Sequence, residues 1–332
     1  MIRENRILVT GRDEIIGSST FERASREDEE NYFSCLNHVG AIHQFAFSRL
    51  PWVERESESP IEIKSANWHV TMNCNYRCKF CFYKNMTGEF RNLERAKHIL
   101  ETLKSKGIEK INFAGGEPLL YKDLNYLLKM AKDLGFTVSI VTNASLLDEN
   151  KIRQFSSYVD WIGVSVDSAD EDIEKELGRG GGNHVAHIRN VCEMIRRMGI
   201  RLKINTTVTK MNFSENMTQF ISSLCPDRWK VFQMLHMKYQ NDDALYLVPT
   251  KEDFDEFRSI NGGLILDDGS RPAFESDIDM LNSYLIIDPK GNVLLSNDNQ
   301  RSSIPFEELE HMELTDLVDA VKYDERGGHY DW

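Results

Sequence analysis

The chain has 332 residues, of which 41% are hydrophobic and 28% charged, with 8 prolines and 20 glycines. This length allows one large domain or two smaller ones, and the composition excludes a disordered, fibrous or low-complexity protein. The formal net charge of -13 argues against duplex DNA or anionic lipid as the main partner, so we expect no nucleic-acid and no membrane association. The sequence has no apolar run of membrane-helix length and no signal-peptide core at its start, so we expect a cytoplasmic location.

From residue 64 onward, short strand patterns alternate with amphipathic helix patterns, which is typical of repeated βα units and a parallel sheet. Strands are predicted near 66–72, 110–114, 137–142, 161–166, 201–208 and 228–235. Helices are predicted at about 92–106, 122–134, 147–157, 170–177, 184–198 and 214–223. Six such units fit a partial (βα)6 barrel of the TIM type or an open doubly wound sheet, and in both folds ligands bind at the carboxyl ends of the strands.

Four of the predicted strands carry polar side chains on one face only. Because side chains alternate with period two, Asn67 and His69 share one face of the first strand and Trp68 lies on the other. A strand buried in a parallel sheet is ordinarily apolar on both faces, so the pattern predicts a barrel with a polar interior site. An exposed antiparallel sheet alternates in the same way, but the intervening helices argue against it. The polar-face residues of the other three strands are Lys110, Asn112, Gly163, Ser165, Asp167, Lys203, Asn205 and Thr207.

The flanks differ from the central repeats. Residues 1–62, with a possible strand at Arg6–Thr10, are predicted to form an N-terminal extension, and residues 63–240 to form the barrel. Residues 241–332 are predicted to form a C-terminal extension that covers the substrate site, with a helix near 251–259. Two strand-like runs, 283–288 and 293–295, flank a Pro-Lys-Gly-Asn turn and predict a hairpin.

Three of the six cysteines, Cys74, Cys78 and Cys81, cluster where the first strand ends. Three thiolates in one loop can hold a soft metal, and no fourth cysteine lies at a matching spacing nearby. A structural zinc site needs four protein ligands, so a zinc-binding interaction module is the remote alternative. Three ligands to a four-iron cluster leave one iron open for an external ligand.

This loop, with the aromatic Phe82 directly after Cys81, resembles the cluster-binding loop of the radical S-adenosylmethionine (SAM) enzymes. The resemblance implies a [4Fe–4S] cluster on the three cysteines and SAM as a cosubstrate at the fourth iron. The Gly-Gly-Glu-Pro run after the second strand resembles the glycine-rich motif of that family, in which Glu117 would offer a carboxylate to an ammonium. The predicted SAM-binding residues are Phe80, Gly115, Gly116, Glu117, Asn143, Ser165 and Arg179.

A longer series of segments, from about residue 64 to the end, is similar to the viperin family of nucleotide dehydratases. Besides the cysteine loop, the segments are 109–113, 178–180, 203–205, 228–233, 283–286, 326–328 and the terminal Asp331-Trp332. The resemblance implies conversion of a nucleoside triphosphate to its 3′-deoxy-3′,4′-didehydro analogue, an antiviral chain terminator; we expect CTP, with UTP and GTP as alternatives. It also implies that the reduced cluster cleaves SAM to a 5′-deoxyadenosyl radical that removes the hydrogen at ribose C4′, with an electron donor such as flavodoxin or ferredoxin.

A triphosphate carries about four negative charges, which a net acidic protein can hold only by converging cations in a partly desolvated site. Lys110 and Lys203 point inward by the pleat, and Lys230 lies on the next strand. Inward lysines are costly unless they pair with anions, so together they favour phosphate. The resemblance implies that these lysines and Arg179 contact the triphosphate. It places Asn205 at the ribose, adds Asn67 and Asn112 to the substrate side, and makes Tyr284 the candidate catalytic residue near the ribose, although a core aromatic fits that position equally well.

Two features depart from animal viperins. The first thirty residues are acidic and lack a cationic amphipathic helix, and the tail after Gly328 is short. These departures predict a prokaryotic or otherwise membrane-free member. The remaining enzyme alternative is a radical SAM protein that acts on another phosphorylated nucleoside or sugar.

Overall fold

The computed structural model describes residues 61–297 and 299–330. Ile61–Trp332 is one compact unit of the chain. The predicted strand at Arg6–Thr10 and nearly all of the predicted N-terminal extension lie outside the described residues.

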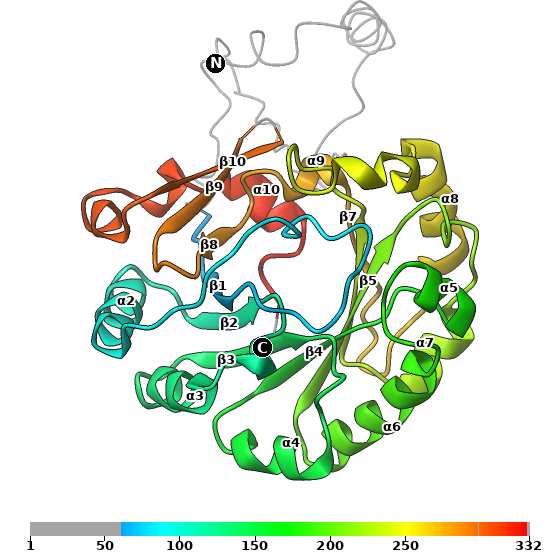
Figure 1. Cartoon of the computed structure of the whole chain (residues 1–332), viewed down its shortest axis with the longest axis horizontal. Coiled ribbons are helices and arrows are strands. Elements are labelled where there is room, and N and C mark those ends of the chain that lie inside the picture. The colour runs from blue at the N-terminus through cyan, green and yellow to red at the C-terminus, as the bar shows by residue number, and fades with distance from the viewer. Residues whose placement is uncertain (1–60, 298, 331–332) are drawn as a thin grey trace, which may run out of the picture. The chain divides into compact units, whose positions relative to one another are not determined.

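A ten-stranded sheet in the order β10-β9-β8-β1-β2-β3-β4-β5-β6-β7 forms the framework. Neighbours from β1 to β7 pair in parallel, and β1 also pairs in parallel with β8. The six predicted strands are confirmed as β1 (Ser65–Thr71), β2 (Lys110–Gly115), β3 (Thr137–Thr142), β4 (Trp161–Ser165), β5 (Arg201–Val208) and β6 (Arg228–Gln233). Figure 1 shows the sheet curved around a central space, with its helices on the outer side.

The six predicted helices are confirmed within a few residues. They are α2 (Leu93–Ser105), α3 (Leu124–Asp133), α4 (Glu149–Phe155), α5 (Glu171–Glu176), α6 (His184–Arg197) and α7 (Thr218–Leu224). All of them except α5 bury an apolar stripe, because residues three and four apart share a helix face, whereas the buried residue of α5 is Glu174. Since β7 and β10 are the two ends of the strand order, the described sheet is a partial barrel, as predicted. Within the described chain, none of the helices is both long enough and apolar enough to span a membrane.

The strand register brings polar side chains to the same level inside the barrel. Asn67 lies beside Asn112 on the neighbouring strand, and Ser165 lies beside Asn205, which in turn lies beside Lys230. In a parallel sheet, side chains that are in register point to the same face. The polar interior that the alternation predicts is therefore a set of aligned residues from five strands.

The C-terminal part of the chain continues the sheet past β6 at one edge and past β1 at the other. Its elements are η3 (Asp242–Leu247), α8 (Lys251–Asn261), β7 (Ala273–Glu275), α9 (Asp277–Met280), β8 (Leu285–Ile287), β9 (Val293–Asn297), β10 (Gln300–Ile304), η4 (Phe306–His311), η5 (Leu314–Asp316) and α10 (Ala320–Glu325); η2 (Pro118–Leu120) lies earlier. The predicted hairpin is confirmed by the antiparallel pairing of β8 with β9. Strands β7 and β10 were not predicted.

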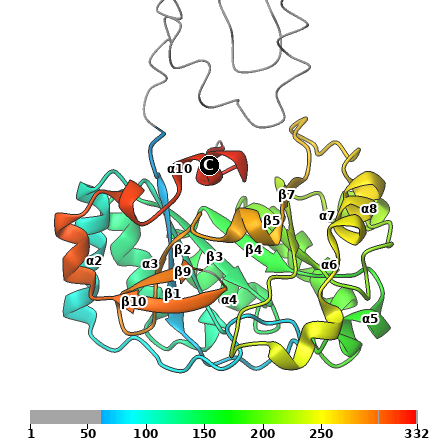
Figure 2. The ribbon, with the colours of Figure 1, turned by 90° about the horizontal axis from the view of Figure 1, so that it is seen from above.

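Helix α10 lies at one end of the barrel and the loop that follows β1 at the other, as Figure 2 shows. The buried Tyr323 of α10 shares a hydrogen bond of 3.0 Å with the Ser65 hydroxyl and accepts one of 3.2 Å from the Lys64 backbone N–H. A second tie runs from Arg228 Nη2 to the Gly327 carbonyl at 2.7 Å. The last helix thus anchors the amino ends of the first and sixth strands.

We predict that Tyr323→Phe lowers the free energy of unfolding by about 1–3 kcal/mol, because two hydrogen bonds of about 0.5–1.5 kcal/mol each are lost while the ring stays in place. Denaturant unfolding checks this value. Tyr126→Phe is the control, because Tyr126 is 52% exposed. A Tyr323→Phe protein as stable as the parent would show that the tie contributes nothing.

Candidate active site

A cavity of about 750 Å³ runs from the loop after β1 into the barrel interior. All but two of the predicted site residues line it: Asn67, Cys74, Cys78, Phe80, Cys81, Asn112, Gly115, Gly116, Asn143, Ser165, Arg179, Lys203, Asn205, Lys230 and Tyr284. The two exceptions are Lys110 and Glu117. One cavity therefore joins the cysteine loop to the polar faces of the strands.

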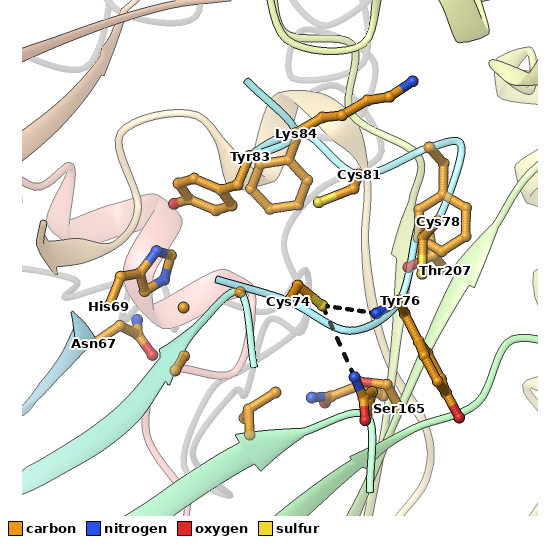
Figure 3. Close-up of a pocket in the computed structure, with 18 of the residues that line it drawn as sticks. Asn67, His69, Cys74, Tyr76, Cys78, Cys81, Tyr83, Lys84, Ser165 and Thr207 are labelled. Atoms are coloured by element: carbon orange, nitrogen blue, oxygen red, sulfur yellow. Dashed lines mark hydrogen bonds between the residues drawn. The ribbon is translucent and has the colours of Figure 1, made fainter. Parts of the chain in front are cut away.

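The sulfur atoms of Cys74, Cys78 and Cys81 border the same space, as Figure 3 shows. Backbone bonds hold the loop to the segment after α5, because the Lys79 N–H donates to the Leu177 carbonyl at 2.8 Å. In residues 61–297 and 299–330, no three His, Cys, Asp or Glu side chains converge on a single ion. Three thiols that border one space without closing on a single ion fit a larger cluster with one open iron better than a zinc ion.

The protonation state of the thiols also bears on metal binding. Burial raises the pKa of Cys78 to about 12 and also raises the pKa of Cys81, so both are protonated near neutral pH without a metal. A bound metal removes the proton, because only the thiolate is a ligand. Loading of this loop with iron must therefore release protons.

Gly115 and Gly116 let two chain segments touch. A Cβ on Gly115 would lie 2.1 Å from the Thr71 carbonyl oxygen, and a Cβ on Gly116 would lie 2.3 Å from the Asn73 carbonyl oxygen. Gly115 also has φ of +145°, where other residues are strained. The Gly116 N–H donates to the Thr71 carbonyl at 2.6 Å. The close approach that requires glycine is thus between β2 and the start of the cysteine loop.

The Glu117 side chain is held from within the protein. The residue is fully buried, and its carboxylate accepts hydrogen bonds from the Thr142 hydroxyl at 2.7 Å, the Asn143 N–H at 2.8 Å and the Leu119 N–H at 3.0 Å. The expected contact of this carboxylate with an ammonium stays a prediction. Glu117 fixes the turn that carries Asn143, which does line the cavity.

Arg179 is a buried cation held by two carboxylates. Its Nε donates to Asp167 Oδ2 at 2.5 Å and lies 3.6 Å from Glu174 Oε2. Burial and the adjacent Asp167 raise the pKa of Glu174. Its guanidinium also lies 5.4 Å from the centre of the Phe80 ring. The side chain is thereby held at the cavity wall beside the cysteine loop.

Lys203 and Lys230 line the deep end of the cavity, where both are buried. Burial lowers the pKa of Lys203 to about 8 and that of Lys230 to about 7, and Arg228 adds to both shifts. Lys230 pairs with Glu275, whereas Lys203 forms no ion pair within the described residues. Sequence reasoning missed Arg228 and Glu275.

Lys110 is separate from this cavity. It is the first residue of β2, and its Nζ donates to the Tyr330 hydroxyl and lies 4.7 Å from the centre of the Trp161 ring. Lys110 is on the inner face of the sheet, as the alternation of side chains predicted. Because it is the first residue of β2, however, it lies at the amino end of the barrel, away from the carboxyl ends of the strands. The charges of Lys203 and Lys230 nevertheless act on it, and its predicted contact with substrate stays a prediction.

Three cavity residues outside the predicted site form one wall. The His69 and Tyr83 rings are 4.4 Å apart, and the Arg301 guanidinium lies 3.7 Å from the centre of the Tyr83 ring. Burial lowers the pKa of His69 to about 3, so this imidazole is neutral. His69 was recognised on the polar strand face, but Arg301 lies on β10, for which the sequence gives no strand pattern.

Comparison with known proteins defines the class. The model of the radical SAM superfamily matches residues 68–221. Streptococcus suis SuiB bound to S-adenosylmethionine has a TM-score of 0.60 at 17% identity and covers 93% of this chain and 74% of its own. Native anSMEcpe with bound AdoMet has a TM-score of 0.53 at 14% identity, covering 78% and 84%. The fold, the cysteine loop and these matches define a radical SAM enzyme.

Relatives found by sequence define a narrower family within this class. The "S-adenosylmethionine-dependent nucleotide dehydratase" of a Thermoplasmatales archaeon (strain ISO4-H5) is 37% identical over 83% of this chain and 99% of its own. The protein of that name from Flammeovirga pacifica is 35% identical over 81% and 92%. "S-adenosylmethionine-dependent nucleotide dehydratase RSAD2" of Siniperca chuatsi is 33% identical over 84% and 82%. The chain therefore belongs to the S-adenosylmethionine-dependent nucleotide dehydratases, the viperin family, as its sequence motifs predicted.

We predict that Gly115→Ala costs at least about 2 kcal/mol of stability and loses most of the iron bound after anaerobic reconstitution, because the new methyl group meets the Thr71 carbonyl and the positive φ is strained. Gly181→Ala is the matched control, since a Cβ there has no atom within 4 Å. Equal iron content in the two variants would contradict the role given to this contact.

Proposed function

We propose that this chain dehydrates a nucleoside triphosphate, CTP first and UTP or GTP as alternatives, to its 3′-deoxy-3′,4′-didehydro analogue, an antiviral chain terminator. The observation that carries the proposal is Lys203, a buried lysine without an ion pair among the described residues, at the deep end of a cavity whose other end carries three thiols. A buried cation without a counter-ion is costly, so this position favours an anionic ligand. The family to which the chain belongs supports a nucleotide as that ligand.

Cys74, Cys78 and Cys81 would hold the [4Fe–4S] cluster. When bound, the cluster and SAM supply a carbon-centred radical that removes a hydrogen atom from the substrate. The candidate SAM side is the wall formed by Gly115, Gly116, Asn143, Ser165 and Arg179. The cavity would hold the two reactants next to each other in a fixed orientation.

The ribose fits between the cysteine loop and the lysines. Asn112 and Asn205 each line the cavity, and their Oδ1 atoms are buried without a hydrogen-bond partner in the described part of the chain. Such atoms need donors, which ribose hydroxyl groups provide. The Asn112 amide is also oriented by a 2.8 Å bond from its Nδ2 to Asn67 Oδ1. We therefore assign these three amides to the ribose side.

Two further proposals concern the rest of the chain. We propose that residues 63–240 act as the barrel and residues 241–332 as the extension that completes the site, since Tyr284 and Arg301 of the extension line the cavity. We also propose a small redox protein, a flavodoxin or ferredoxin, as electron donor. A radical SAM activity on another phosphorylated nucleoside or sugar is the alternative, because buried lysines bind any phosphate ester.

The decisive assay incubates the reconstituted enzyme anaerobically with SAM, a reductant and each of the four ribonucleoside triphosphates. We expect one triphosphate to stimulate 5′-deoxyadenosine formation and to lose one water in mass. Cys78→Ala is the control, which should lose the cluster and SAM cleavage because one of the three ligands is missing. SAM cleavage that no triphosphate stimulates would favour the alternative substrate.

We predict that Lys203→Ala weakens triphosphate binding by about 1.5–3 kcal/mol and leaves SAM binding nearly unchanged, because a charge-assisted hydrogen bond is lost only to the phosphate. Calorimetry with each ligand separates the two effects. Equal weakening of both ligands would contradict the assignment of Lys203 to the phosphate.

Triphosphate affinity should also depend on pH. Burial lowers the pKa of Lys203 to about 8 and of Lys230 to about 7, so both are cationic at lower pH and lose their protons as pH rises through these values. We therefore predict that affinity falls between about pH 7 and pH 9, above the titration of the phosphate itself. A flat affinity across this range would show that neither lysine titrates at the phosphate.

A further inference from the structure

Glu275 lies behind the cavity wall and contacts two of the residues that form it. Its carboxylate accepts a hydrogen bond from the Tyr284 hydroxyl through Oε2 and forms an ion pair with Lys230 through Oε1. Lys230 Nζ in turn donates to the Tyr284 hydroxyl oxygen at 3.1 Å. Lys230 and Tyr284 line the cavity, but Glu275 does not. The three side chains therefore form a closed triangle with one member out of reach of the substrate.

The fold explains why the carboxylate is there. Glu275 ends β7 and lies in register with Phe232 of β6, two residues beyond Lys230. Its side chain has no exposed surface. A buried carboxylate is stable only when it is paired and hydrogen-bonded, and Lys230 and Tyr284 together supply both. The Glu275 carboxylate is thus paired through Oε1 and hydrogen-bonded through Oε2.

Besides Glu275, the charged groups found to act on Lys230 among the described residues are Arg228 and Arg326, which are both positive. Several charged or titratable groups interact with the triangle of Lys230, Tyr284 and Glu275: Arg228, Arg326 and Lys203. The charge of Lys230 also acts on Lys110. Among these groups, Glu275 is the one carboxylate. Without it, Lys230 would sit in a buried cluster of like charges, where the neutral amine is favoured.

We propose that Glu275 is a positioning residue that increases the cationic fraction of Lys230 and turns the Tyr284 hydroxyl proton away from the cavity. The proposal rests on the proposed function, in which Lys230 faces the triphosphate. Glu275 itself touches neither substrate nor cofactor. It acts through the two residues that do line the site.

The triangle constrains what Tyr284 can offer to a substrate. Its proton points to Glu275, and one lone pair of its oxygen accepts from Lys230. Its ring is fixed by Arg326, whose guanidinium carbon lies 3.6 Å from the ring centre and whose Nε donates to the Ser283 carbonyl at 2.9 Å. Tyr284 therefore meets a ribose through its ring or as a hydrogen-bond acceptor, while its proton stays with Glu275.

The test measures the titration of Lys230 directly in the reconstituted full-length protein. Selective ¹³C labelling of lysine allows the Lys230 signal to be followed by NMR as pH changes, and Lys230→Arg identifies that signal by its loss. We expect Glu275→Gln to lower the titration midpoint by about 1–3 pH units, because an adjacent opposite charge shifts a midpoint by that amount. Glu275→Asp, which retains the charge, should shift it less. An unchanged midpoint in a folded Glu275→Gln protein would overturn the proposal.

Asp160→Asn is the matched control. Asp160 also pairs with a lysine, Lys132, at 2.6 Å, but it is half-buried and lies outside the cavity lining. This variant should leave the Lys230 midpoint in place. A shift of equal size in Asp160→Asn would mean that loss of any lysine-paired carboxylate is enough, which contradicts a specific role for Glu275.

Binding of inorganic tripolyphosphate separates this proposal from the proposed function. At a pH halfway between the two midpoints, Glu275→Gln should bind the probe more weakly than the parent, by about threefold if the midpoints differ by about 1 pH unit and about thirtyfold if they differ by about 3. The difference should disappear in the Lys230→Arg background, where the cation no longer titrates. A lowered Lys230 midpoint with no binding of the probe by any variant would support Glu275 and contradict the phosphate site. If Glu275→Gln bound the probe as tightly as the parent when Lys230 is present, the positioning role would be contradicted.

Discussion

Inward-facing polar groups on a curved parallel sheet are the constraint on which this structure depends. Each βα unit turns one strand face into the barrel, and in this chain that face carries amides or lysines on β1, β2, β5 and β6. Such groups lose water on folding and must be paired. Asp167 supplies a partner for Arg179 and fixes it, whereas no ion pair is found for Lys203 among the described residues, which is why we propose an anionic ligand there.

The same constraint explains what the sequence could predict. Strands β1 to β6 and their helices follow from hydrophobic periodicity, and the cysteine spacing identifies the loop at the mouth of the barrel. Parity also placed Asn67, Asn112 and Asn205 on the inner face. The alternation of side chains tells which face of the sheet a residue is on, but not how far along the barrel axis it lies. Lys110 is on the inner face but is the first residue of β2, so it lies at the amino end of the barrel. That position depends on where each strand begins, which the alternation does not define.

The missed residues share a different cause. Glu275 lies on β7, whose three residues are too few to show a period, and Arg301 lies on β10, whose five residues include one apolar side chain and show no apolar alternation. Their neighbours in space are far away in the chain, so no local spacing relates them to the site. Glu117 was found by its motif, but the motif does not reveal that its carboxylate is already occupied by three donors.

The backbone bonds between the cysteine loop and the segment after α5 have one more consequence. Leu177 and Gly178 hold the loop, and the next residue is Arg179. A Cβ on Gly178 would lie 2.3 Å from the Arg77 carbonyl oxygen, so the backbones of the cysteine loop and of the segment after α5 are in direct contact. A movement of the cysteine loop would therefore be transmitted to the backbone that carries Arg179, so the loop and this arginine cannot shift independently.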